Sequence, residues 1–192
     1  MSTADPNHVM MTGENPFIRL SETDGGEHST DASYWRVMFS PAGPGHVLFM
    51  RSELTGDELR IYSDNIAMTR WLQSTIQGVL NPATADLALP VIDAEFAKSG
   101  DPNYFWTEHI SSLQDEITMT WYDVAESLLI HTEPNAAPDR PYGVCTILMP
   151  AAGARLTVNG DSAKGRPWTR EREGRPFSTC CLAFSESWTE SR

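Results

Sequence analysis

The chain lacks long apolar runs and contains only three cysteines. No stretch approaches the ~20 consecutive apolar residues that a membrane-spanning helix needs. Residues 1–14 are polar and have no apolar centre, so we expect a flexible N-terminal tail there rather than a signal peptide. Cys145, Cys180 and Cys181 show no disulfide-framework spacing, and adjacent cysteines rarely pair, which predicts reduced thiols in a cytoplasmic protein.

Basic residues are also scarce. Lys and Arg number 14 against 26 Asp and Glu, which gives a formal net charge of −12 in 192 residues. An acidic surface repels phosphate backbones and anionic lipids, so we expect neither nucleic acid nor a membrane as a partner. The simplest role of this charge is solubility. The length suits one domain, which we place at residues 15–192.

The motifs of several reaction classes are missing. No H-x-H, H-E-x-x-H or C-x-x-C occurs, so we predict no metal site. No glycine-rich phosphate or dinucleotide loop is present, and we predict no cofactor. No G-x-S-x-G occurs, and Cys180 and Cys181 lie in an apolar strand, where thiols are usually inert packing.

What the chain does contain is a series of short β patterns separated by turn residues. We expect strands over residues 17–22, 34–40, 46–53, 59–63, 91–97, 104–110, 116–122, 128–133, 143–149, 154–158 and 178–188. About ten twisted antiparallel strands in one domain curl into a barrel or a barrel-like sandwich. The predicted fold class is therefore mainly β, with one embedded helix.

That helix is predicted over residues 65–80. Met68, Trp71, Leu72, Ile76 and Val79 recur at helical spacing and should pack against the barrel, over an open end or an outer face. Asp64 or Asn65 can cap its start, and Asn81-Pro82 ends it.

The strand over residues 104–110 indicates a site inside the barrel. Trp106 and Glu108 share one face, and a large aromatic is more readily placed inside than outside, so Glu108 should enter the interior with it. The competing register places Phe105, Thr107 and His109 inside and leaves Glu108 in solvent.

The last strand carries a second candidate carboxylate. Alternation places Glu186 on the same face as Cys180, Leu182, Phe184 and Trp188. Burial there would raise the pKa of Glu186 and make it a usable general acid or base. The alternative is a carboxylate at the barrel mouth, solvated or paired with arginine. We expect Tyr122 or Glu186 to lie close to Glu108.

Two arginines are candidate counter-charges. Arg36 shares its face with Tyr34, and Arg60 shares its face with Tyr62. Inside a barrel either arginine would need a carboxylate or an anionic ligand, whereas an outward arginine is the simpler alternative. The predicted substrate-contacting set is Arg36, Arg60, Tyr62, Trp106, His109 and Trp188, beside the acid/base candidates Glu108, Tyr122 and Glu186.

Many antiparallel strands, aromatic side chains and no cofactor motif together resemble the lipocalin-like (calycin) class of barrels. The resemblance covers most of the chain at the level of architecture, and it implies a cavity for a small ligand. The lipocalin G-x-W is replaced by Tyr34-Trp35-Arg36, and the helix follows the third or fourth strand instead of the last.

Two function classes follow. The first is a cofactor-independent lyase, hydratase, isomerase or cyclase that acts on a small apolar or aromatic molecule by acid/base catalysis. The second is a small-molecule carrier, which needs a cavity but no poised acid. Two or more titratable groups converging on one point would favour the enzyme, which we prefer because the strands carry many polar residues that can face inward. A homodimer is compatible with either.

Overall fold

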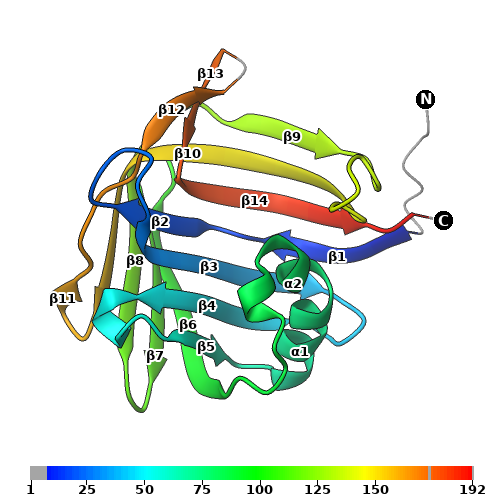
Figure 1. The fold of residues 1–192 in the computed structure, drawn as a ribbon, viewed down its shortest axis with the longest axis horizontal. Coiled ribbons are helices and arrows are strands. Elements are labelled where there is room, and N and C mark those ends of the chain that lie inside the picture. The colour runs from blue at the N-terminus through cyan, green and yellow to red at the C-terminus, as the bar shows by residue number, and fades with distance from the viewer. Residues whose placement is uncertain (1–7, 173, 192) are drawn as a thin grey trace.

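Nine strands form a closed, mixed β-barrel in the computed structural model, which describes residues 8–172 and 174–191 (Figure 1). Around the barrel the order is β14-β2-β3-β4-β5-β6-β7-β8-β10, and pairing of β10 with β14 closes it. β1, β9, β11, β12 and β13 lie outside this ring of nine. The bounds of all strands in the described residues are β1 (Val9–Glu14), β2 (Phe17–Ser21), β3 (His28–Phe39), β4 (Gly45–Ser52), β5 (Leu59–Ser63), β6 (Val91–Asp101), β7 (Phe105–Ser112), β8 (Glu116–Val124), β9 (Leu128–Thr132), β10 (Gly143–Val158), β11 (Asp161–Ser162), β12 (Thr169–Arg172), β13 (Arg175–Ser178) and β14 (Cys180–Thr189). The predicted mainly-β barrel is confirmed.

One pair of neighbouring strands is parallel. β5 pairs with β6 through Ile61↔Val91 to Ser63↔Asp93, because the helical segment between them crosses over and returns the chain in the same direction. The expectation of a purely antiparallel barrel is therefore wrong at this point. Lipocalins are eight-stranded up-and-down barrels, so the architecture shared with them is the closed barrel itself.

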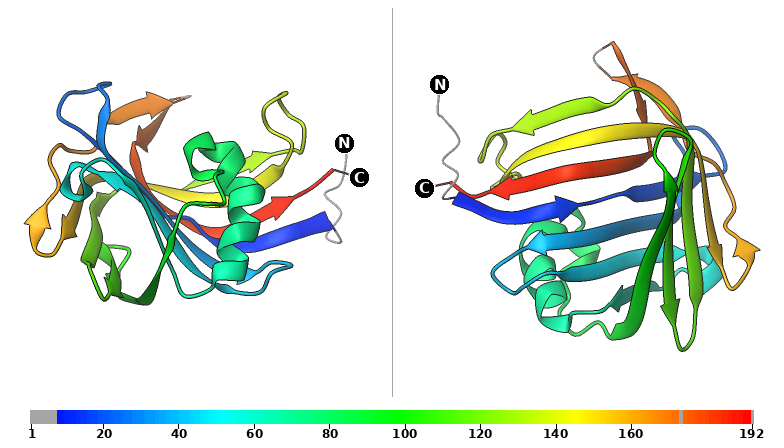
Figure 2. Two further views of the ribbon diagram at one scale, coloured as in Figure 1. Left: turned by 60° about the horizontal axis from the view of Figure 1, so that its bottom comes forward. Right: turned by 180° about the vertical axis from the view of Figure 1, so that it is seen from behind.

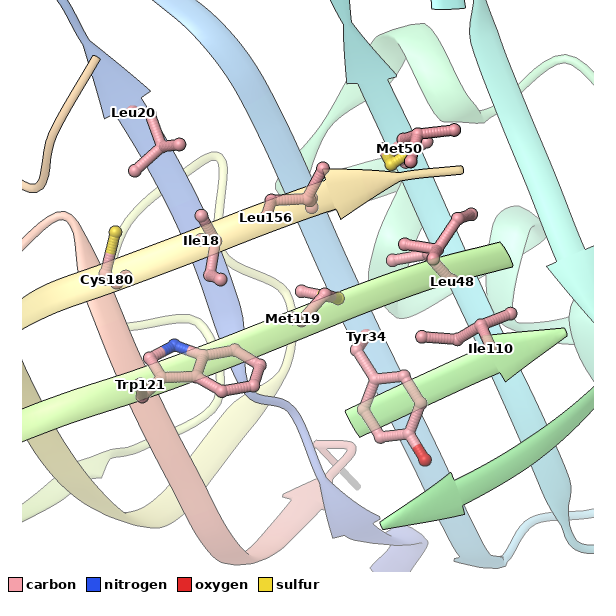
Figure 3. Close-up of a cluster of buried hydrophobic side chains, with 14 of the residues drawn as sticks. Ile18, Leu20, Tyr34, Leu48, Met50, Ile110, Met119, Trp121, Leu156 and Cys180 are labelled. Carbon is pink, nitrogen blue, oxygen red and sulfur yellow. The ribbon is translucent and has the colours of Figure 1, made fainter. Parts of the chain in front are cut away.

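The barrel wall is apolar on both of its faces. Tyr34, Leu48 and Met119 belong to the inner cluster of buried side chains, which Figure 3 shows projecting between the strands. Trp35 and Phe49 belong to an outer cluster on the opposite face of the same wall. This explains the uninterrupted apolar run 47–50 in β4, since a strand buried on both faces has no reason to alternate with polar residues.

Two consecutive helices cover the outer face. α1 (Ile66–Ser74) and α2 (Ile76–Leu80) pack over β3, β4 and β5, while β6, β7 and β8 form the far side of the barrel (Figures 1 and 2). The Asn65 side chain accepts a 3.1 Å hydrogen bond from the Met68 amide and caps α1. Two short 3₁₀ helices, η2 (Glu53–Thr55) and η3 (Pro82–Thr84), lie in the connections.

The predicted apolar helix face is correct for only part of its length. Met68, Leu72 and Ile76 are completely buried, whereas Trp71 is half-buried and Val79 is 40 % exposed. The reason is the interruption at Thr75, whose backbone is not helical, so that one helical periodicity does not extend through residues 65–80.

Three further expectations need correction. Residues 9–14, assigned to a flexible tail, form β1, which pairs with β14 and β3 and buries Met11. Residues 1–7 of that tail lie outside the described residues. The strands predicted over 143–149 and 154–158 are one strand, β10. Residues 161–176, for which we expect no strand, contain β11, β12 and the first half of β13. In the described part of the chain, no helix is long and apolar enough to cross a bilayer.

Leu72 tests the packing of the helices on the wall. Leu72→Ala should lower the free energy of unfolding by about 2–5 kcal/mol, because it leaves a cavity in the outer cluster. Ile66→Ala is the matched control, since Ile66 is 61 % exposed and its truncation should change stability by no more than about 0.5 kcal/mol. Urea unfolding measures both, and equal effects would contradict the assigned helix face.

Candidate functional site

Glu108 lies inside the barrel with Trp106, as the strand parity predicts. Its carboxylate is 1 % exposed and accepts a 2.8 Å hydrogen bond from the indole Nε1 of Trp106. The Tyr34 hydroxyl lies close by, and Arg36 is in reach of its charge. Burial raises the pKa of Glu108, against the opposing effects of Trp106, Arg36 and Tyr34.

Arg36 faces this interior network and pairs with Glu14, the last residue of β1. The sequence predicts an arginine that needs a carboxylate partner if it turns inward, and Glu14 supplies it. Burial, followed by the Glu108 charge, raises the pKa of Tyr34, so the phenol stays protonated at neutral pH. Within this network Arg36 pairs with Glu14 and Trp106 donates to Glu108, while Arg36 Nε is buried without a hydrogen-bond partner.

A second interior network surrounds Asp115, in the turn between β7 and β8. Arg60 Nη1 donates to Asp115 Oδ2 at 2.9 Å, and the Tyr62 hydroxyl donates to the same oxygen at 2.7 Å. Asn159 Nδ2 reaches the other oxygen at 3.3 Å. Sequence reasoning missed Asp115, because its turn position suggests solvent. Arg60 and Tyr62 thus lie together, but in a network separate from that of Glu108.

The space around these two networks is packed with apolar side chains. Met119, Trp121, Ile110, Leu48 and Leu156 are completely buried and belong to one cluster (Figure 3). Small barrels are commonly filled in this way, so that the interior is a core.

Strand β14 changes faces at Ser185. Ser185 has a left-handed backbone, with φ 55°, and the pairing with β10 shifts there from Ile147↔Phe184 to Cys145↔Ser187. This is a β-bulge, which inserts one extra residue and reverses the side-chain alternation beyond it. Before the bulge Leu182 and Phe184 face the interior, whereas beyond it Trp188 joins the outer cluster.

Glu186 therefore lies on the outer face of the wall, and the single continuous face predicted for residues 180–188 is wrong. Glu186 lines a cavity of about 230 Å³ between α2 and the wall, and we call this cavity the outer pocket. The outer pocket is lined by Asn15, Phe17, Arg19, Asp31, Ser33, Gln77, Leu80, Asn81, Ile130, Val144, Thr146, Leu148, Ala183, Glu186 and Trp188.

The Glu186 carboxylate is the buried charge of the outer pocket. It is 4 % exposed and accepts a 2.5 Å hydrogen bond from Trp188 Nε1. Burial raises its pKa to about 7, and the Trp188 hydrogen bond opposes that rise. The Thr146 hydroxyl also favours the ionised form, although it makes no hydrogen bond of normal geometry and is itself buried.

Uncharged polar groups hold α2 to the wall beside this carboxylate. Gln77 Oε1 accepts hydrogen bonds from Trp35 Nε1 at 2.8 Å and from Ser33 Oγ at 3.4 Å. Asn15 Nδ2 donates to Ser33 Oγ at 3.1 Å and to the Tyr34 carbonyl at 2.8 Å. These hydrogen bonds fix the positions of the polar side chains on one side of the outer pocket. The sequence signal for it is Gln73 and Gln77, which fall among the apolar helix positions and are both buried.

The charged residues at the other end of the outer pocket are neutralised. Arg19 Nε pairs with Asp31 Oδ1 at 3.4 Å, and its guanidinium stacks over the Phe17 ring at 4.8 Å. Neither group pairs with Glu186.

Two other predicted site residues lie away from both carboxylates. Tyr122 is 42 % exposed and stacks its ring against Gly153 on β10, so the expectation that Tyr122 or Glu186 adjoins Glu108 is wrong. His109 is exposed on the outside of β7, where its Nε2 lies 3.2 Å from Ser99 Oγ. Trp188 lies beside Glu186 and packs against Trp35, with ring centroids 6.2 Å apart.

The three cysteines are the remaining candidate reactive groups. Cys180 and Cys181 are buried free thiols, and burial raises the pKa of each to about 12. Cys145 is an exposed free thiol. Within residues 8–172 and 174–191, no group of three or more His, Cys, Asp and Glu residues is arranged to hold a metal ion.

Comparison of the chain with family models, with curated proteins and with solved structures gives no significant match. The outer pocket and its buried carboxylate are therefore the features of the molecule that indicate a function.

The raised pKa of Glu186 should make stability depend on pH. Between pH 4.5, the ordinary pKa of glutamate, and pH about 7, Glu186 is protonated in the folded state and ionised in the unfolded state. Stability should therefore fall as pH rises through this window. Glu186→Gln removes the effect, so the variant should gain about 3 kcal/mol over the parent between pH 4.5 and pH 8.

Denaturant titrations of both proteins at four or five pH values measure this difference. Because Glu108 is unchanged in both proteins, its own titration cancels. A stability difference that stays constant from pH 4.5 to pH 8 would show that Glu186 ionises freely in the folded protein.

Proposed function

We propose that this protein binds a small molecule in the outer pocket and that the barrel serves as the scaffold for that site. The supporting observation is a cavity of about 230 Å³ that contains a buried carboxylate without an ion-pair partner among the described residues. Ligand sites are typically concave, mostly apolar and fitted with a few fixed polar groups. Leu80, Ile130, Val144 and Leu148 form the apolar part here.

The size of the outer pocket limits the ligand. Drug-sized sites enclose ~300–1,000 Å³, and a cavity of ~150 Å³ admits benzene. A volume of about 230 Å³ thus suits a single ring or a short aliphatic chain with one or two polar groups. A lipocalin-like site inside the barrel has less support, because the interior is packed with the side chains of the inner cluster.

Binding is favoured over catalysis by the number of titratable groups. Acid/base catalysis generally uses two groups positioned at one reacting centre. In the outer pocket Glu186 is the buried titratable side chain, whereas Arg19 and Asp31 pair with one another. Glu108 does not line the outer pocket, and its hydrogen bond from Trp106 and the Arg36–Glu14 pair belong to the packed barrel interior.

A second candidate function rests on one specific observation. Burial raises the pKa of Glu186 to about 7, which suits a general acid or base at neutral pH. An acid/base enzyme of the lyase or isomerase type, working on a small molecule in the outer pocket, would use Glu186 alone or with a group on the substrate.

We also propose a reducing compartment, the cytoplasm, on the basis of the three free thiols.

Ala183 offers a direct test, because it is 1 % exposed and its side chain lines the outer pocket. Ala183→Leu should fill part of the cavity and abolish binding of fragments that the parent binds in ligand-observed NMR with a library of small ring compounds. Ala152→Leu is the matched control, since Ala152 is exposed on β10 outside the outer pocket and should leave binding unchanged.

Circular dichroism and thermal melting establish that both variants are folded. Fragments that bind the parent and Ala183→Leu equally well would place the site elsewhere. A parent that binds none of the library would contradict the proposed function.

A further inference from the structure

The Glu186 carboxylate has no cationic partner among the residues that the structure describes. Arg36 pairs with Glu14, Arg60 with Asp115 and Arg19 with Asp31, and none of these arginines contributes to the electrostatics of Glu186. A buried carboxylate normally has a positive partner or a full set of hydrogen bonds. Glu186 has the indole N–H of Trp188 and, without normal hydrogen-bond geometry, the nearby Thr146 hydroxyl, and both groups are uncharged.

We propose that the occupant of the outer pocket is a small organic cation, a primary amine whose ammonium group pairs with Glu186. This inference rests on the proposed function and names its ligand class. The positive charge of the ammonium would balance the negative charge of Glu186. The other charged side chains of the outer pocket, Arg19 and Asp31, already balance one another.

Hydrogen-bonding capacity supports the same class of ligand. An ammonium has three donors and no acceptor. The Glu186 carboxylate offers acceptor positions beyond the one that Trp188 uses, and the buried Thr146 hydroxyl oxygen has no partner of normal geometry. Both residues line the outer pocket on adjacent strands, β14 and β10. An anion there would face the carboxylate and lose its hydration without compensation.

The rest of the outer pocket suits the body of such an amine. The apolar side chains Leu80, Ile130, Val144 and Leu148 can take a ring or a short hydrocarbon chain. The net charge of −12 also favours the approach of a cation over that of an anion.

Affinity for an amine should follow the ionisation of Glu186. The other ionisable side chains that line the outer pocket, Arg19 and Asp31, pair with one another, and His28 Nδ1 lies 3.9 Å from Asp31 Oδ2. None of these three groups contributes to the electrostatics of Glu186, and Gln77, Ser33 and Asn15 do not titrate. A cation favours ionised Glu186, so its affinity should rise as pH increases from 5 to 8.

Isothermal titration calorimetry with three probes of one shape tests the ligand class. The probes are benzylammonium, benzyl alcohol and benzoate, which carry positive, zero and negative charge. The parent at pH 8 should bind benzylammonium at least about tenfold more tightly than benzyl alcohol, the scale expected for a hydrogen bond to a charged group. Benzoate should not bind measurably.

Variants connect the preference to the residue. Glu186→Gln should weaken benzylammonium binding by about tenfold or more and leave benzyl alcohol unchanged. Glu95→Gln is the charge-matched control on the exposed face of β6 and should bind all three probes like the parent.

The outcomes separate this inference from the proposed function. If benzyl alcohol or benzoate binds the parent as tightly as benzylammonium, or if Glu186→Gln keeps the full affinity for benzylammonium, the ligand is not a cation, although the outer pocket remains a site. If no probe binds the parent, and Ala183→Leu does not alter any fragment binding, the proposed function fails and the inference fails with it.

Discussion

The site depends on the β-bulge at Ser185. A regular strand alternates its side chains between two faces, so without an extra residue Glu186 would follow Leu182 and Phe184 into the barrel. The left-handed backbone at Ser185 reverses this order and places Glu186 and Trp188 on the outer face, opposite Gly13 and Met11 of β1. A non-glycine residue in this conformation costs roughly 1–2 kcal/mol. The closed hydrogen-bonded barrel and the burial of Trp188 in the outer cluster offset that cost.

The outer face can receive this carboxylate because the wall of β3, β4 and β14 is buried on both sides. The inner cluster occupies one side, and α1, α2 and the outer cluster cover much of the other. The helical break at Thr75 divides the cover into two short helices, and Gln77 at the start of α2 is fixed to the wall by Trp35 and Ser33. The cavity lies where this cover ends, beside Leu80 and Asn81. The barrel interior thus provides stability, and the outer wall provides the site.

Local patterns in the sequence predict most of the fold. Alternation and turn residues place most strands near their observed positions, and Asn65 marks the start of α1. Parity also predicts that Trp106 brings Glu108 inside. The bulge has only a weak signal. Phe184 and Trp188 have the parity of one continuous strand face, and Glu186 between them is the single polar residue on that face. Asp115 and β1 were missed for a related reason. Their burial comes from partners distant in sequence, Arg60 and Tyr62 in one case and β14 in the other, and local patterns do not reveal such partners.

The most direct measurement is a crystal structure of the protein grown with benzylammonium at pH 8. We expect electron density for the ligand between α2 and the wall, with the ammonium nitrogen within hydrogen-bond distance of the Glu186 carboxylate and of Thr146 Oγ1. We also expect the inner cluster, including Tyr34 and Trp121, to be unchanged from the ligand-free protein. Ligand density inside the barrel beside Trp106 and Glu108, or Glu186 on the same face of β14 as Phe184, would contradict binding in the outer pocket.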